Sequence, residues 1–201
     1  LISIINENNG YQVYPSGERK NRFKPWLINA FQLALETGLR REEFMLLKFS
    51  DIDYDKSGLP QFLKIENFKV NRQKGLDSKV GEKKYVPITK SLQILLIDLG
   101  YDEYKDSDRF LLGGNEKSSR ATLIDFVSKV FTHFWKQTGF EKKVQLKSLR
   151  KTYLTALVEH FGDKAPIISN HSGIAVLKKH YVNDKQLALA TKNFSVFKKS
   201  M

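Results

Sequence analysis

The stretch LETGLRREEFMLLKFSDID, residues 35–53, carries the clearest signals for the fold. Apolar residues recur at helical spacing from residue 24 to residue 36, and Pro25 suits the first turn of a helix. Gly38 interrupts this pattern, and REEFMLLKF continues it as a second helix that ends at the Asp-rich segment SDIDYDKSG. The stretch therefore predicts two helices joined at a glycine.

The segment that follows predicts a small β-structure. Residues 61–70 tend to alternate apolar and polar, a basic glycine-containing stretch comes next, and KKYVPI resumes the apolar pattern. We interpret these segments as two strands joined by a long hairpin loop.

The rest of the chain is predicted to be helical. No βαβ alternation is present, so the fold class expected is α+β: a mostly helical domain with a small antiparallel β-sheet, a hairpin or meander, on one side. The polar, turn-rich residues 1–23 are expected to be a tail or linker remnant, and residues 24–201 to be one domain. The helices expected lie over residues 91–99, 119–138, 147–161, a short segment from Pro166, about 173–180 and about 184–194.

The charge of the chain indicates a polyanionic partner. Lysine and arginine number 34 against 22 aspartate and glutamate, a net charge of +12, and the basic residues are clustered rather than spread evenly. The alternative is a basic surface that is merely solvated. The clusters lie at Arg19, Lys20, Arg22 and Lys24, at Lys64, Lys69, Arg72, Lys74, Lys79, Lys83 and Lys84, and at Lys142, Lys143, Lys147, Arg150 and Lys151.

Composition also excludes several classes of site. The absence of cysteine excludes disulfides, thiolate zinc sites and a cysteine nucleophile, and it fits a reducing compartment. Four scattered histidines make a metal site improbable. No apolar run approaches the roughly 18 residues of a membrane helix, so no membrane partner is expected. The chain begins at Leu1 without a signal-peptide pattern, which suggests a fragment of a longer protein.

Three segments, in this order along the chain, resemble the catalytic domain of the tyrosine recombinases, the phage-integrase family. They are LETGLRREEFMLLKFSDID (35–53), LKSLRKTYLTAL (146–157) and NHSGIAVLKKHYV (170–182). The family pattern has T-G-L-R-x-x-E, then a strand lysine, then H-x-L-R-H/K-T, then G-H-S followed by a tyrosine. The resemblance spans about residues 24–195. It implies site-specific cleavage and rejoining of double-stranded DNA through a 3′-phosphotyrosine intermediate, without cofactor or metal.

The resemblance implies a role for each matching residue. Arg40 and Arg150 would clamp the phosphate, because a guanidinium offers a planar fork to two phosphate oxygens and stays charged. Tyr181 would attack the phosphorus, and His171 would donate a hydrogen bond to a phosphate oxygen. A lysine on the hairpin would protonate the leaving 5′-oxygen. Lys69, expected at the end of the first strand, is preferred for this role over Lys74 and Lys79 in the loop.

Each of these residues also has a plainer interpretation. Arg40 could make a helix-surface ion pair with Glu43 or Glu36, Arg150 could lie on a solvated basic face, and Tyr181 could be a packing tyrosine. We also expect Glu43 to hold Arg40 in position and Asp51 to brace a turn. His180 is a weaker candidate for orienting the tyrosine.

Two residues depart from the family pattern. Lys147 stands where the family usually has histidine, and Asn170 stands in place of glycine. A lysine can contact phosphate as a cation but is a poor base near pH 7, so we expect Lys147 to supply charge and a hydrogen bond. These departures raise an alternative function, a DNA-binding module of recombinase fold with weak or lost catalysis. A relaxing topoisomerase is a third possibility.

The resemblance also implies partners and a location. A homo-tetramer on DNA is expected, with a monomer in the absence of DNA, in the cytoplasm of a bacterium as a bacterial or phage-encoded, nucleoid-associated protein. Phe194, Val196 and Phe197 in the C-terminal tail could anchor a neighbouring protomer or pack on their own domain.

Overall fold

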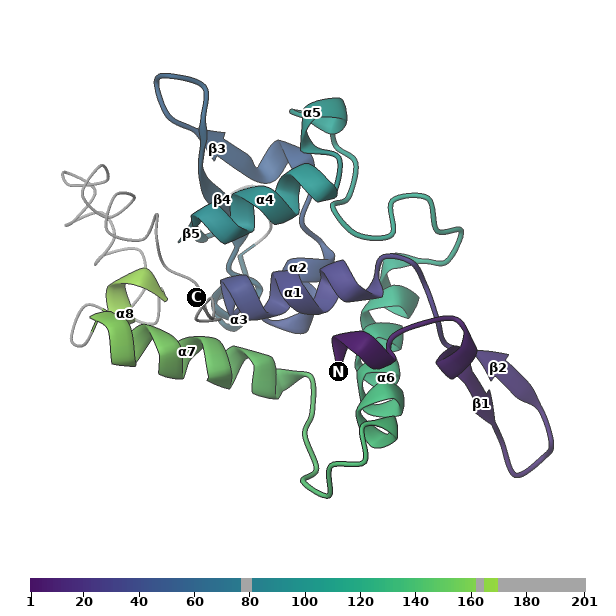
Figure 1. Cartoon of the computed structure of the whole chain (residues 1–201). Coiled ribbons are helices and arrows are strands. Elements are labelled where there is room, and N and C mark those ends of the chain that lie inside the picture. The colour runs from purple at the N-terminus through teal and green to yellow at the C-terminus, as the bar shows by residue number, and fades with distance from the viewer. Residues whose placement is uncertain (77–80, 162–164, 170–201) are drawn as a thin grey trace.

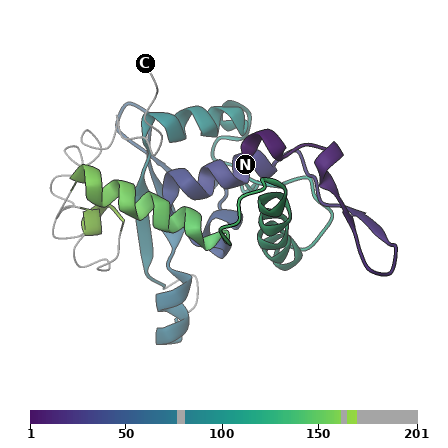
Figure 2. The same ribbon diagram turned by 60° about the horizontal axis from the view of Figure 1, so that its bottom comes forward.

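The computed structural model describes residues 1–76, 81–161 and 165–169 (Figure 1). Residues 1–23, predicted as a tail or linker remnant, form two short 3-10 turns at Ile2–Ile4 and Asn8–Gly10 and a hairpin of β1 (Tyr11–Val13) and β2 (Arg19–Asn21). The hairpin projects from the body of the protein (Figure 2), while Ile5 is buried in the main core. The start of the chain is thus anchored to the domain through an apolar side chain.

The two predicted helices joined at a glycine are present. Helix α1 (Leu27–Thr37) ends at Gly38, whose φ of 60° is left-handed and closes the helix through a backbone bond to Ala34. Helix α2 (Arg41–Met45) begins after Arg40, and its first turn is capped by the Glu43 carboxylate. A 3-10 turn at Phe49–Asp51 follows, in which the Asp51 carboxylate accepts a hydrogen bond from the Lys48 backbone N–H at 2.9 Å, the bracing role expected for it.

A three-stranded antiparallel sheet comes next, with β4 (Pro60–Glu66) between β3 (Ile52–Tyr54) and β5 (Lys83–Pro87). The register places Ile65 opposite Lys84. Strands β4 and β5 correspond to the two predicted strands, whereas β3 was not predicted. Its two neighbouring aspartates gave the segment the composition of a turn.

The first predicted strand ends earlier than expected, and the prediction of a strand up to residue 70 is wrong. The chain leaves the sheet after Glu66 and forms helix α3 (Phe68–Lys74), which Gly75 ends with a φ of 63°. The helix is tied to the start of β5, because the Glu82 backbone N–H donates to the Asn71 side-chain oxygen at 2.8 Å. This contact joins residues far enough apart in the chain that local alternation could not reveal it.

Four of the remaining helices lie close to their predicted places: α4 (Lys90–Asp98), α6 (Arg120–Gln137), α7 (Lys147–Phe161) and α8 (Ala165–Ile168). The short helix α5 (Tyr101–Tyr104) was not predicted, and the helices predicted at about 173–180 and 184–194 lie outside the described residues. Helix α1 lies between α4 and α7 (Figure 1), and α2 packs on α6. The main core is rich in aromatic side chains, with the Phe31 and Phe131 rings meeting edge to face at 5.2 Å. This architecture confirms the predicted α+β class with a mostly helical domain and a small antiparallel sheet.

Within the described part of the chain, the structure contains no helix with the length and apolar character needed to span a bilayer.

Candidate active site

The site is built around the close contact between the end of α1 and helix α7. A Cβ placed on Gly38 would lie only 2.1 Å from a ring carbon of Tyr153, which is buried on α7. Only glycine fits this position, both for its left-handed backbone and for the space available. Arg150 lies one turn before Tyr153 and donates a hydrogen bond to the Gly38 carbonyl oxygen. The glycine therefore brings Arg150 alongside the turn that carries Arg40.

Arg40 is held at both its backbone and its side chain by Glu43. Its backbone N–H donates to Glu43 Oε2 at 2.7 Å, and its guanidinium Nη1 donates to Glu43 Oε1 at 3.0 Å. The Glu43 carboxylate is almost fully buried, whereas the Arg40 side chain remains 42% exposed. The ion pair considered for Arg40 is thus present, and it fixes the guanidinium without removing it from solvent.

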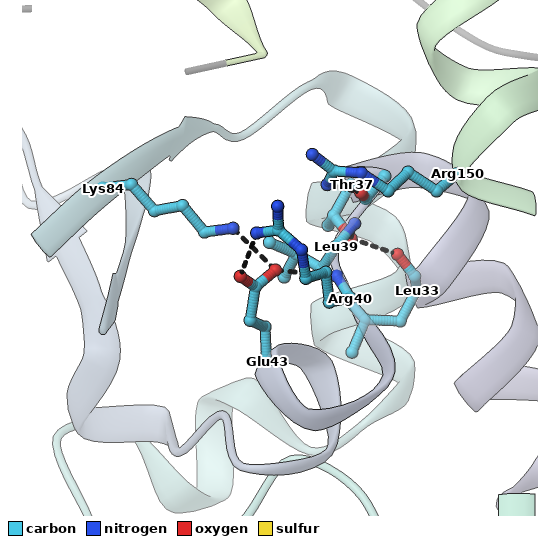
Figure 3. Close-up of polar contacts among 8 residues, drawn as sticks. Leu33, Thr37, Leu39, Arg40, Glu43, Lys84 and Arg150 are labelled. Atoms are coloured by element: carbon cyan, nitrogen blue, oxygen red, sulfur yellow. Dashed lines mark hydrogen bonds and ion pairs between the residues drawn. The ribbon is translucent and has the colours of Figure 1, made fainter. Parts of the chain in front are cut away.

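Arg40 and Arg150, 110 positions apart in the sequence, lie on the same side of the turn (Figure 3). Burial and the positive charge of Arg40 both lower the pKa of Arg150, although Arg150 keeps its proton at any physiological pH. Two guanidinium groups that repel each other in this way form a favourable position for an anion.

A pocket of about 370 Å³ opens beside these two arginines. Lys147, the exposed first residue of α7, contributes a further cation at its wall. The lining combines basic and apolar side chains, as suits a phosphodiester with its attached sugar. Its walls are formed by Ala34, Leu39, Arg40, Arg41, Phe44, Ser128, Thr132, Gln145, Leu146, Lys147 and Arg150.

Lys84 belongs to this region, although the sequence analysis named it only as a member of a basic cluster and gave it no role in the site. It reaches from β5 to Glu43, and its Nζ lies 2.6 Å from Glu43 Oε2, with side-chain exposures of only 6% and 1% (Figure 3). The signal was present in KKYVPI, because Lys84, Val86 and Ile88 alternate and all three are buried. A lysine on the apolar face of a strand needs a buried partner, and that could have drawn attention to it.

Burial and electrostatics act in opposite directions on this pair. Burial favours the neutral form of Glu43, but the charge and hydrogen bond of Lys84, together with those of Arg40, outweigh it and lower the pKa of the carboxyl. Burial, and repulsion from Arg150 and Arg40, lower the pKa of Lys84 to about 8 although Glu43 acts against this. Near neutral pH the pair is therefore ionised.

Of the three candidates for the general acid, the two that the structure describes do not lie as predicted. Lys69 lies in the first turn of α3 and not at a strand end, because the chain turns into a helix after Glu66. Lys74 is exposed at the end of α3 and forms an ion pair with Glu82. Lys79 lies outside the described residues.

The third predicted segment lies outside the described residues, with Asn170, His171, His180, Tyr181 and the aromatic tail at 194–197. Among the residues that the structure does describe, no group of three histidine, aspartate or glutamate side chains could hold a metal ion.

The fold and the basic pocket define a domain of the tyrosine recombinase class, and the comparison with known families agrees. The sequence model of the phage integrase family matches residues 18–187. The chain belongs to the phage integrase family, as its motifs predicted.

Solved structures with a similar fold include two of lambda integrase. A lambda integrase(75–356) dimer bound to a COC′ core site is 21% identical with a TM-score of 0.52, over 75% of this chain and 51% of that chain. A lambda integrase dimer bound to a COC′ core site is 21% identical with a TM-score of 0.51, over 81% of this chain and 43% of that chain. This chain therefore spans about half the length of the first and less of the second. No match was found among curated proteins.

Proposed function

We propose that residues 24–201 form the catalytic domain of a tyrosine-type site-specific DNA recombinase, which cleaves and rejoins double-stranded DNA through a 3′-phosphotyrosine intermediate. One observation carries the proposal: Arg40 and Arg150 come from distant parts of the chain to line one pocket with Lys147. Such a concentration of cations around a small pocket is costly for the free protein and is relieved by a bound phosphate.

In this reaction the Tyr181 oxygen attacks the phosphorus, a P–O bond to the tyrosine forms, and the P–O5′ bond breaks. The phenol loses its proton, and the leaving 5′-oxygen gains one from a general acid. Arg40 and Arg150 stabilise the charge that develops on the phosphate oxygens, and Lys147 and His171 add a cation and a hydrogen bond. Because the energy of the phosphodiester is kept in the tyrosyl bond, rejoining needs no nucleotide cofactor.

The general acid remains assigned to Lys69, with Lys74 and Lys79 as alternatives. The position of Lys69 in the first turn of α3 keeps it next to the strand from which the family's lysine acts. The ion pair of Lys74 with Glu82 makes Lys74 the weaker choice, because its ammonium group is already engaged.

Double-stranded DNA is the proposed partner, with a homo-tetramer as the assembly on DNA and a monomer without it. The net charge of +12 supports a polyanionic partner. Both lambda integrase structures described above are dimers bound to a DNA core site. The corresponding location is the cytoplasm of a bacterium, where the protein would be encoded by the bacterium or by a phage.

The test is a covalent capture experiment on a pool of nicked duplexes with randomised cores, because a nick beside the cut lets the cleaved fragment diffuse away and traps the intermediate. We expect an adduct that survives denaturation and that mass spectrometry maps to Tyr181. Tyr181→Phe should abolish the adduct and keep DNA binding, whereas Tyr11→Phe, a control on the exposed β1–β2 hairpin, should form it normally.

Binding to the pool without any adduct would refute the enzymatic proposal and favour the DNA-binding module. The features that favour that alternative are the exposed Lys147 in the position of the family's histidine and Asn170 in the position of its glycine.

A further inference from the structure

We propose that Lys84 is a positioning residue for strand cleavage: it holds the Glu43 carboxylate, which in turn fixes the Arg40 guanidinium at the pocket. The inference rests on the proposed function and adds to it a residue outside the recombinase motifs that identified the family.

The geometry of the Glu43 carboxylate carries the argument. One oxygen accepts from the Arg40 guanidinium at 3.0 Å, and the other accepts from the Arg40 backbone at 2.7 Å and contacts the Lys84 ammonium at 2.6 Å. With 1% of its side chain exposed, Glu43 has almost no access to water. Without Lys84, the carboxylate would keep the ion pair with Arg40 and lose the other one that the described residues give it, and it would gain by drawing the guanidinium inward.

The location of Lys84 makes it suited to this role. It is anchored on a paired strand, opposite Ile65, and its stem lies on the buried face of the sheet. A side chain held this way defines the position of a carboxylate more closely than one on an exposed loop. Arg40 is the N-cap of α2 and is hydrogen-bonded to the Glu43 carboxylate. A displacement of this carboxylate would therefore displace the Arg40 guanidinium.

A stability role alone does not account for this pair. Burying two charges is costly, and apolar side chains of similar volume are often equally or more stabilising. The charged groups that face Lys84 are Glu43 from α2, Arg40 before it and Arg150 from α7. Two of these three are cations, and burial together with their repulsion lowers the pKa of Lys84 to about 8. Lys84 is thus a charged residue buried beside two other cations, which is electrostatically unfavourable. Its presence there indicates a function at the pocket.

The test is a double-mutant cycle of Lys84→Met and Glu43→Gln. Single-turnover cleavage is measured with saturating nicked duplex, and DNA affinity is measured separately by anisotropy. We expect Lys84→Met to slow cleavage by about 100-fold, the size of effect that a misplacement near 1 Å causes, with affinity changed less than about three-fold. In the Glu43→Gln background, Lys84→Met should add almost nothing, because the two residues act as one unit.

Two further variants complete the design. Lys84→Arg keeps the charge and should restore most of the cleavage rate. Lys83→Met is the matched control, since it removes a lysine from the same strand on the opposite face, and it should cleave at nearly the wild-type rate. Thermal unfolding of each variant shows whether it is folded, and if Lys84→Met is not, Lys84→Arg and the double variant decide the question.

Three results would overturn the inference. They are a wild-type rate in Lys84→Met, additive effects in the cycle, and rescue of Lys84→Met by a 5′-phosphorothiolate leaving group. The last would make Lys84 the proton donor instead, because a sulfur leaving group needs no proton. Failure of the wild-type chain to form any adduct would refute the proposed function itself and is thereby distinguishable.

Discussion

Replacing Gly38 with alanine tests the contact that brings the two arginines together. The added Cβ would lie 2.1 Å from a Tyr153 ring carbon, and Tyr153 is only 3% exposed, so its ring cannot move aside without opening the α1–α7 interface. A left-handed backbone costs a non-glycine residue about 1–2 kcal/mol, and overpacking of a dense core adds about 1–3 kcal/mol. We therefore expect Gly38→Ala to lower the free energy of unfolding by about 2–5 kcal/mol.

The matched control is Gly139→Ala at the end of α6. Gly139 has a φ of 75° but no atom within 4 Å of its added Cβ, so this variant should show only the backbone cost of about 1–2 kcal/mol. Both variants are measured by urea unfolding followed by circular dichroism, with unchanged m-values required. In a Tyr153→Ala background the two alanine substitutions should become equally costly, since the clashing ring is gone. If Gly38→Ala and Gly139→Ala lower the free energy of unfolding of the wild-type chain by the same amount, within about 0.5 kcal/mol, the reasoning is refuted.

Four further outcomes are expected. Because the pKa of Lys84 is lowered to about 8, wild-type cleavage should fall relative to Lys84→Arg as pH rises from 7 to 9.5, and a flat ratio of the two rates would contradict this. The same lowered pKa means that the unfolded chain binds more protons above pH 8, so the Lys84 contribution to the free energy of unfolding should rise there. Burial raises the pKa of Glu36 despite its hydrogen bond from Ser91, so the folded chain keeps this proton longer than the unfolded chain and loses stability as pH rises from 4 to 7. Glu36→Gln should therefore gain stability relative to wild type over that range in urea unfolding, and a constant difference would speak against it. Trp26→Phe should cost about 1 kcal/mol, because it removes the indole hydrogen bond to Glu116 at 3.0 Å; thermal unfolding with no change would show that this bond is not stabilising.

Local patterns were sufficient for most of the elements and for the family. Helical periodicity placed α1, α6 and α7 within a few residues of their observed bounds, because each helix buries a face whose spacing is visible in the chain. Gly38 was correctly predicted to end a helix, because a glycine that interrupts a helical pattern is typical of the left-handed residue at a helix end. The arginine motifs could be recognised because the residues around Arg40 and Arg150 resemble the pattern of the family, in the same order along the chain.

Contacts between distant segments were not accessible in this way. Strand alternation up to residue 70 could not be told from the start of α3, which is tied to the far side of the loop by the bond between Asn71 and Glu82. The buried ion pair of Lys84 with Glu43 joins a strand to a helix 41 positions earlier in the chain, and nothing in either local pattern specifies the partner. The Gly38–Tyr153 contact likewise explains the glycine only once α1 and α7 are packed. Propensity and spacing act within a few residues, whereas the position of a charge depends on which surfaces the folded chain brings together.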